Sequence, residues 1–445
     1  MDPTVLKRLA MPALAPHRSR EGCVVRDAEE VPMADWTALL EGALREQALR
    51  TVEEIADALR EGQGVEGAAL AGGVAGLAFL FAELERGQPR NGHRARAERL
   101  LQEAAAAIEQ QPLPPWFYAG FSGIAWSMER LGAMGVPSLD GLEEIDEALL
   151  GLVSRRPWSA DYDLIAGLVG LGVYALERLP RPAAVRCLEE IVARLEERAI
   201  PAGPGLSWWT PPQLLPEHQR AVYPDGYFNL GAAHGVPAVV ALLALCARAG
   251  VAGAKARELA AGGARWLLAN ASPDSPGARF LPCIALGVAP RFSRSAWCYG
   301  DPGVVLCLLV AARALSDREL ERAALELARE AARRPAEDCG VKDAGVCHGA
   351  AGLGHLYNRL YQVTREPLFK EVATSWFSRT LELRRPGEGV AGYFSWSAVP
   401  GLEEVGWVPD GTLLTGATGI ALALLAACHP FPPSWDGMFM ASIPA

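Results

Sequence analysis

The stretch GVAGLAFLFA, residues 73–82, joins a small-residue G-x-x-G element to an apolar run, and its recurrence decides the fold. Six further copies follow along the chain, and each opens another apolar helical run. The seven elements are Gly73–Gly76, Gly120–Gly123, Gly167–Gly170, Gly235–Ala238, Gly300–Gly303, Gly349–Gly352 and Gly416–Gly419. The first glycine permits a tight turn, and the second small residue lets two helix backbones approach closely. The pattern predicts seven copies of one helical unit.

Amphipathic, charged segments alternate with these apolar runs, as in Arg94–Gln110, Ala183–Ala199 and Asp317–Arg334. Each repeat therefore predicts one polar outer helix and one apolar inner helix. Seven such hairpins could stack as an open solenoid or close into a ring. An open superhelix needs polar caps at its ends, and Ile420–Pro433 carries none. We therefore expect an all-α fold, an α/α toroid or double-layered α-barrel of seven helical-hairpin repeats.

The length of 445 residues would suit two or three domains, but a repeat array extends one continuous core. We expect a single domain over residues 1–445, in which about residues 1–30 form an N-terminal extension whose fold the pattern does not define. Three long insertions interrupt the regular spacing, and insertions of this length in a compact domain are usually functional. They are Pro201–Asn229, Asn270–Trp297 and Arg385–Gly411.

Composition narrows the classes of partner. The formal net charge is −10 and no Lys/Arg stripe stands out, which argues against nucleic acid or an anionic membrane surface. The longest apolar runs, Val236–Cys246 and Val304–Ala312, are too short for a transmembrane segment. Nine cysteines form an odd set without the spacing of a disulfide scaffold. We expect a cytoplasmic protein whose thiols are free or bound to metal.

Chemically versatile side chains stand one or two residues ahead of the first glycine in three successive repeats. His234 precedes the fourth element, Cys298 and Tyr299 the fifth, and Cys347 and His348 the sixth. If the repeats are equivalent, these residues occupy matching places at the N-terminal ends of neighbouring inner helices. Such ends converge on one mouth in a closed ring, so residues far apart in the sequence are expected to meet.

Two cysteines and a histidine suit zinc, because thiolate sulfur and imidazole nitrogen are its preferred ligands. Three protein ligands leave the fourth tetrahedral position open, which is typical of a catalytic site. We predict one zinc ion held by Cys298, Cys347 and His348. Taken singly, each could instead be a buried thiol or a core histidine. Cys339 is a rival ligand in a polar turn, although it lies off the repeat register.

His234 leaves three roles open. It could be a fourth ligand, which would close the site, or a structural histidine that bonds a neighbouring turn. It could also be a catalytic acid or base, since its unperturbed pKa lies near 6.5. We favour acid/base work.

Three segments resemble the signatures of lanthionine synthetase C-like proteins, the lantibiotic cyclases. They are Trp297-Cys-Tyr-Gly300, Cys347-His-Gly-Ala-Ala-Gly352 and Gly231-Ala-Ala-His-Gly235. The resemblance extends over all seven glycine elements, from about residue 50 to the end. It implies an α/α toroid with one zinc ion that cyclises a ribosomally made peptide in which Ser and Thr are already dehydrated. One departure, Ala238 in place of a glycine, should shift a helix contact and leave the chemistry alone.

The resemblance also implies roles for individual residues. Cys298, Cys347 and His348 correspond to the family's zinc ligands, and His234 to its proposed acid or base. Tyr299 matches a tyrosine beside the first zinc cysteine. Arg294 matches an arginine and Asp163 an aspartate, with Arg291 and Asp161 as their alternatives. Without the resemblance, Asp163 reads as a helix N-cap, Arg294 as a solvated charge and Tyr299 as a packing aromatic.

The implied reaction adds a cysteine thiolate to dehydroalanine or dehydrobutyrine to form a (methyl)lanthionine thioether. A free thiol of pKa about 8.5 is barely ionised at neutral pH, and zinc would ionise it. The resulting enolate needs a proton, for which His234 is the candidate acid, oriented by Asp163. Arg294 or Tyr299 would stabilise the enolate oxygen.

The expected partners are a dehydrated precursor peptide with its leader and a separate dehydratase, because the chain has no room for a dehydrating domain. Two other functions stay open. One is a related protein that adds glutathione to dehydrated residues, and the other is a zinc-containing scaffold that binds peptides without catalysis.

Overall fold

A computed structural model describes residues 36–60, 63–89, 92–137, 141–275, 277–289, 293–398 and 404–444. The expected N-terminal extension, residues 1–30, and Arg291 lie outside the described residues. None of the helices in the described ranges is both long and apolar enough to cross a membrane.

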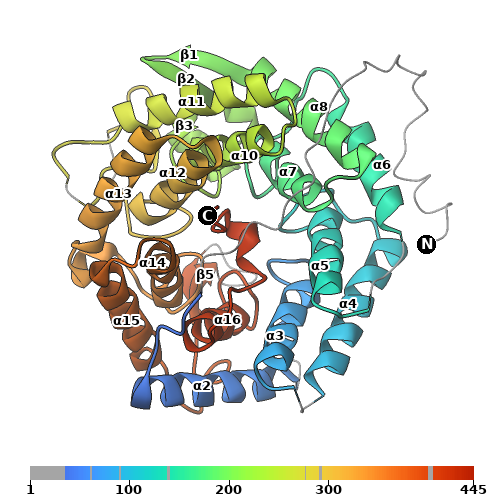
Figure 1. Ribbon diagram of the computed structural model, residues 1–445, viewed down its shortest axis with the longest axis vertical. Helices are drawn as coiled ribbons and strands as arrows, with labels where there is room; N and C mark the ends of the chain where they lie inside the picture. The colour runs from blue at the N-terminus through green and yellow to red at the C-terminus, as the bar shows by residue number, and fades with distance from the viewer. Residues whose placement is uncertain are drawn as a thin grey trace.

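Each repeat glycine is followed at once by a helix, and these helices form the inner layer of a closed ring (Figure 1). Each inner helix packs against the next, and the last packs against the first, so the ring has no open end. Within the described residues the inner helices are α3 (Val74–Gly87), α5 (Phe121–Ala133), α7 (Leu168–Glu177), α10 (Val236–Arg248), α12 (Asp301–Leu315), α14 (Ala350–Thr364) and α16 (Ala417–Cys428). The predicted α/α toroid is confirmed.

Outer helices alternate with the inner helices along the chain. Most pack with their apolar side on the inner helix that comes before them, and the first outer helix packs on the last inner helix. The outer helices are α2 (Gly42–Arg60), α4 (His93–Gln110), α6 (Leu142–Val153), α8 (Pro182–Arg198), α11 (Gly253–Ala269), α13 (Arg318–Ala332) and α15 (Pro367–Glu382). In α13, for example, Leu320, Ala324 and Ala328 are buried, and Asp317 caps the first turn by accepting from two backbone N–H groups. The inner helices are buried nearly all round, as the sequence predicted.

The second glycine of the repeat is needed for a different reason from the one that the sequence suggested. A Cβ added at Gly123 would lie 1.8 Å from the carbonyl oxygen of Phe117, and one at Gly303 would lie 1.9 Å from that of Trp297. Both oxygens belong to the chain just ahead of the same helix. In the six repeats that have this glycine, it therefore lets the opening turn fold back over its own helix, more than it lets two helices meet.

Two of the three long insertions contribute to one small antiparallel sheet, which the sequence did not predict. Its strands run in the order β1 (Ala199–Ala202), β2 (Gly205–Thr210), β3 (Tyr227–Asn229) and β4 (Cys283–Ile284), and the short helix α9 (Glu217–Val222) and a 3-10 turn (Pro212–Leu214) lie between β2 and β3. The third insertion forms the hairpin of β5 (Ser395–Ala398) and β6 (Val405–Val408). A further 3-10 turn spans Ala336–Cys339.

The chain after α16 turns back into the middle of the ring, where Figure 1 marks the C-terminus. This segment contains the 3-10 turn Asp436–Phe439. The Tyr118 hydroxyl donates to the Met438 carbonyl at 2.7 Å, and Trp297 Nε1 donates to the Phe439 carbonyl at 2.9 Å. Asp436 is fully buried there. The C-terminal segment thus fills the lumen with hydrogen bonds to the turns before two inner helices and to residues within α3, α5 and α14.

Candidate metal centre and catalytic site

Cys298, Cys347 and His348 lie together at the N-terminal mouth of the inner ring. Their ligand atoms are all within 4.8 Å of one another, and no other group of this kind occurs among the described residues. Cys298 belongs to the turn before α12, and the other two to the turn before α14. The two cysteines are 7 % and 8 % exposed. The structure thus brings together the three residues that the sequence predicted as metal ligands.

A closed belt of backbone hydrogen bonds explains why these turns meet. In every repeat the residue two positions before the first glycine forms a hydrogen bond of this belt. Cys298 and Cys347 are these residues in repeats five and six. The N–H to carbonyl bonds run Ala71 to Tyr118, Tyr118 to Ile165, Leu164 to Ala233, Ala233 to Cys298, Cys298 to Cys347, Cys347 to Leu414 and Leu414 back to Ala71, at 3.0–3.5 Å. The belt satisfies buried peptide groups and sets the distance between the two cysteines.

His234 directly follows Ala233, the belt residue of repeat four, and so stands one residue before its repeat glycine, as His348 does in repeat six. Its Nδ1 lies 2.5 Å from Oδ2 of Asp163, whose other oxygen accepts from the Ala166 N–H at 2.7 Å. Asp163 is therefore the partner of His234 and also shapes the opening turn. It is not the helix N-cap that was its alternative, because Gly167 holds that position before α7. Burial opposes the charged imidazole, but the hydrogen bond and charge of Asp163 outweigh it and raise the pKa of His234.

The neighbouring carboxyl, Asp161, forms no hydrogen bond with His234 in the described part of the chain. Burial and the charge of Asp163 raise the pKa of Asp161 to about 6. Of the two aspartates left open by the sequence, Asp163 is the one hydrogen-bonded to His234.

Tyr299 and Arg294 complete the surroundings of the cluster. The Tyr299 ring stacks beside that of His234 with centroids 6.4 Å apart, and its hydroxyl accepts from Asn229 Nδ2 at 3.1 Å. Burial raises the pKa of Tyr299, so its hydroxyl keeps its proton. Arg294 is exposed, and its positive charge favours the thiolate forms of Cys298 and Cys347.

A family model described as lanthionine synthetase C-like protein matches residues 64–440, most of the chain. The chain belongs to the lanthionine synthetase C-like family. The solved structure of nisin cyclase is similar in fold, with a TM-score of 0.71 at 19 % identity over 88 % of this chain and 97 % of that one. Glutathione S-transferase LANCL1 of Danio rerio is 30 % identical over 92 residues, which is 21 % of each chain. The match thus spans about a fifth of that curated relative.

The donor set of this LanC-like protein fits a zinc ion on its own chemistry. Hydrogen bonds from Cys347 and His348 lower the pKa of Cys298 well below its usual value. The bond to Cys298, together with burial, raises the pKa of Cys347 well above its own. Two sulfurs this close and this buried can both ionise only beside a cation. Two thiolates and one neutral imidazole would balance the charge of Zn²⁺.

Sequence reasoning missed Asp343, which lies behind His348. Its Oδ2 is 3.7 Å from His348 Nε2 and accepts from the Trp396 N–H at 2.9 Å, and its Oδ1 accepts from the Gly345 N–H. At this distance the two groups interact by charge rather than by a hydrogen bond, and the negative charge of Asp343 favours the protonated form of His348. In this LanC-like protein Asp343 therefore links the β5–β6 hairpin to the candidate metal centre.

A signal for Asp343 was present in the sequence. It lies six residues before the first glycine of its repeat, and Asn229 and Asp410 hold the same position in theirs. All three side chains accept from the backbone N–H two residues on, which shapes the opening turn. Arg294 and Asp161 also stand at this position. Comparing the repeats six residues ahead of the glycine would have found the polar residues around the mouth.

Two rival assignments are not supported by the geometry of the LanC-like protein. Cys339 is outside the cluster, and its Sγ donates to the Pro335 carbonyl at 3.4 Å. His234 is also outside it, with Nδ1 engaged by Asp163. Neither residue joins the three candidate ligands.

Proposed function

We propose that this LanC-like protein is a zinc-dependent peptide cyclase. It would form (methyl)lanthionine rings by adding cysteine thiolates to dehydroalanine or dehydrobutyrine in a dehydrated ribosomal precursor peptide. The observation that carries the proposal is the convergence of Cys298, Cys347 and His348 within 4.8 Å. The family match and the likeness in fold to nisin cyclase support it.

Cys298, Cys347 and His348 would hold the zinc, and the carboxylate of Asp343 lies 3.7 Å from His348 Nε2. When bound, zinc would ionise the thiol of the substrate cysteine and so supply the nucleophile. Because the protein offers three ligand residues, a position for the substrate sulfur remains.

Addition forms a sulfur–carbon bond at the β-carbon and breaks the carbon–carbon π bond. The electron pair moves toward the α-carbon and its carbonyl oxygen, and the α-carbon must then take up a proton. His234 would supply this proton from Nε2, because Nδ1 is held by Asp163. The raised pKa of His234 keeps more of the imidazole protonated at neutral pH. The proton released by the thiol balances the one delivered.

Tyr299 and Arg294 would stabilise the charge that develops on the carbonyl oxygen. Tyr299 can donate because its hydroxyl accepts from Asn229 and keeps its own hydrogen. Arg294 lines the same cavity as Tyr299 and offers a permanent positive charge there, and no ion pair joins Arg294 to a carboxylate among the described residues.

The substrate must already contain dehydrated residues, so a dehydratase has to act first. We place that activity in a separate protein and the whole pathway in the cytoplasm. We also propose that residues 1–445 work as a single cyclase domain, with residues 1–30 as an extension.

The test is to incubate the purified protein with a dehydrated precursor and to count free thiols by alkylation and mass spectrometry. We expect thiols to disappear without a change in peptide mass, and one zinc per chain. Cys298→Ala and Cys347→Ala should each lose the metal and the activity, while Cys339→Ala, a matched buried cysteine, should keep both. Unchanged thiols beside a full zinc content would reject the cyclase and leave a peptide-binding scaffold.

Addition of glutathione to dehydrated residues is a second candidate, favoured by the 30 % identity over 92 residues to Glutathione S-transferase LANCL1 of Danio rerio. The same residues would act, with glutathione as the thiol. The same assay with glutathione and a dehydrated peptide that lacks cysteine distinguishes the two. A mass increase by one glutathione would select this function.

A further inference from the structure

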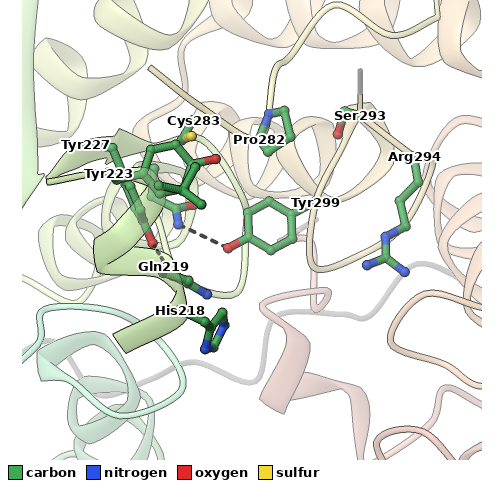
Figure 2. Close-up of a pocket in the computed structure, with 11 residues that line it drawn as sticks. His218, Gln219, Tyr223, Tyr227, Pro282, Cys283, Ser293, Arg294 and Tyr299 are labelled. Carbon is green, nitrogen blue, oxygen red and sulfur yellow. Dashed lines mark hydrogen bonds between the residues drawn. The ribbon is translucent and has the colours of Figure 1, made fainter. Parts of the chain in front are cut away.

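A cavity of about 410 Å³ lies directly beside the candidate site, with Tyr299 in its wall (Figure 2). Its far end is built by the two insertions that precede repeats four and five. The helix α9 and its end supply Val222 and Tyr223, β3 supplies Tyr227, and the chain leading into β4 supplies Pro282. The size falls within the range of small-ligand pockets, about 300–1,000 Å³.

The far end of this cavity contains polar atoms, but several of them are hydrogen-bonded within the wall. The Tyr223 and Tyr227 rings meet edge to face with centroids 4.9 Å apart. The Tyr227 hydroxyl donates to Gln219 Oε1 at 3.2 Å, so that pair is satisfied within the wall. The side-chain amide of Asn229 is likewise engaged within the protein, since it bonds both the Tyr299 hydroxyl and the Gly231 N–H. The lining at this end also includes His218, Gln219 and Cys283, and the rings of Tyr223 and Tyr227 form its apolar part together with Val222 and Pro282.

The near end has the opposite character. Figure 2 shows Tyr299 between the two insertion tyrosines and Arg294. Arg294 has no carboxylate partner among the described residues, and the lining contains no Asp or Glu. An electron-rich oxygen beside Tyr299 and Arg294 would therefore be bound at the end that adjoins Cys298.

We propose that this cavity binds the substrate residue that directly follows the dehydrated Ser or Thr, and that it selects an aromatic or large aliphatic side chain there. The proposal rests on the proposed cyclase function. If the carbonyl of the dehydrated residue lies at Tyr299 and Arg294, the next atom of the chain is the nitrogen of the following residue. That residue then enters the cavity, and its side chain contacts Tyr223, Tyr227 and Pro282. Burial of an apolar side chain among aromatic rings supplies the preference.

Binding of unreactive peptides tests the cavity without requiring catalysis. The probes are short peptides with Ala in place of the dehydrated residue, followed by Phe, Leu, Gly or Glu, and titrated calorimetrically into the zinc-loaded protein. We expect the Phe and Leu peptides to bind at least about tenfold more tightly than the Gly peptide. Equal affinities, tighter binding of the Glu peptide, or a preference set by the preceding residue would overturn the proposal.

Single-residue variants test whether this cavity causes the preference for the following residue. Tyr223→Ala should reduce the Phe-to-Gly affinity ratio to about threefold or less, whereas Tyr223→Phe, which keeps the ring, should retain it. Tyr361→Ala removes a half-buried tyrosine near the end of α14, outside the cavity, and should also retain it. A ratio equally lost in Tyr361→Ala, or kept in Tyr223→Ala, would contradict the assignment.

Thiol counting with the matching dehydrated peptides distinguishes a failure of this proposal from a failure of the proposed cyclase function. Thioether formation without a preference for the following residue would reject the cavity assignment and keep the cyclase. Selective binding without thioether formation would do the reverse.

Discussion

Two histidine–aspartate pairs occupy the two ends of the same ring interior, and their surroundings give them opposite properties. At the mouth, His234 Nδ1 lies 2.5 Å from Asp163, and the imidazole is 44 % exposed. In the lumen, His355 Nε2 lies 2.8 Å from Asp436, and both side chains are buried. The pKa of His234 is raised, whereas that of His355 is lowered.

The difference comes from what else touches each pair. Burial disfavours a charged His355, and Asp436 is already paired with Arg359 at 2.5 and 2.6 Å. His355 Nδ1 has no acceptor among the described residues, so a second proton there would be left unpaired. Asp163 meets no arginine in the described residues, and its charge acts on His234. One pair is thus suited to proton transfer and the other to holding the C-terminal segment.

The largest expected effect is on the rate of thioether formation, in which the pair at the mouth is proposed to act. His234→Asn should lower the thioether-forming rate by about 10²–10⁴-fold, because the general acid is removed. The free energy of unfolding should change less than for the lumen pair, because the imidazole is half exposed and the buried Asp163 keeps its bond from the Ala166 N–H. Thiol-loss kinetics and urea unfolding measure the two quantities. A variant that cyclises at the wild-type rate would remove His234 from the chemistry.

The lumen pair should respond in the opposite way. Asp436→Leu should destabilise the fold by about 3–5 kcal/mol, because Arg359 would be left as a buried, unpaired charge. The double variant Asp436→Leu with Arg359→Met should regain much of that loss, since no unpaired charge remains. Urea unfolding of wild type, both single variants and the double variant gives the coupling. A loss under about 1 kcal/mol in Asp436→Leu would show that the pair does not hold the tail.

The variant Asp163→Asn tests the role of the pair at the mouth through the pH dependence of the rate. The active form of His234 is protonated and is lost as pH rises through its pKa. Asp163 raises that pKa, so its replacement should move the alkaline limb of the rate profile to lower pH. The rate at pH 7 should fall by roughly tenfold or more. An alkaline limb at the wild-type pH would mean that another group titrates.

The smallest expected effect is the pH dependence of stability that His355 confers. Its folded-state pKa is below the unfolded value of about 6.5, so the unfolded chain binds the extra proton first as pH falls. The stabilisation is complete above about pH 6.5 and is lost as pH falls from there toward the folded pKa. His234, with a raised pKa, has the opposite sign, and its contribution is lost as pH rises. His355→Gln should flatten the acid side of the unfolding free energy, and a slope as steep as that of wild type would argue against a neutral His355.

The glycine register made much of the site predictable. His234, Cys298, Cys347 and His348 were found because the repeats place them at equivalent turns, and the backbone belt runs through that register. Asp343 was missed although its position, six residues before the glycine, also repeats. The lumen pair could not be found this way, since Asp436 lies beyond the last repeat and meets His355 only through the return of the chain.

The sequence by itself determined the seven helical hairpins and the residues that stand at their opening turns, because helix periodicity and the demands of glycine are local properties. The closed ring was expected from the missing polar caps and is confirmed by the packing of the last inner helix on the first. Only the tertiary structure decided that Asp163 rather than Asp161 bonds His234 and that the C-terminal segment fills the lumen. These outcomes depend on contacts between distant segments, whose hydrogen bonds and buried surfaces no local pattern encodes. The cluster of Cys298, Cys347 and His348 needed both, since the register chose the residues and the closed belt brought them together.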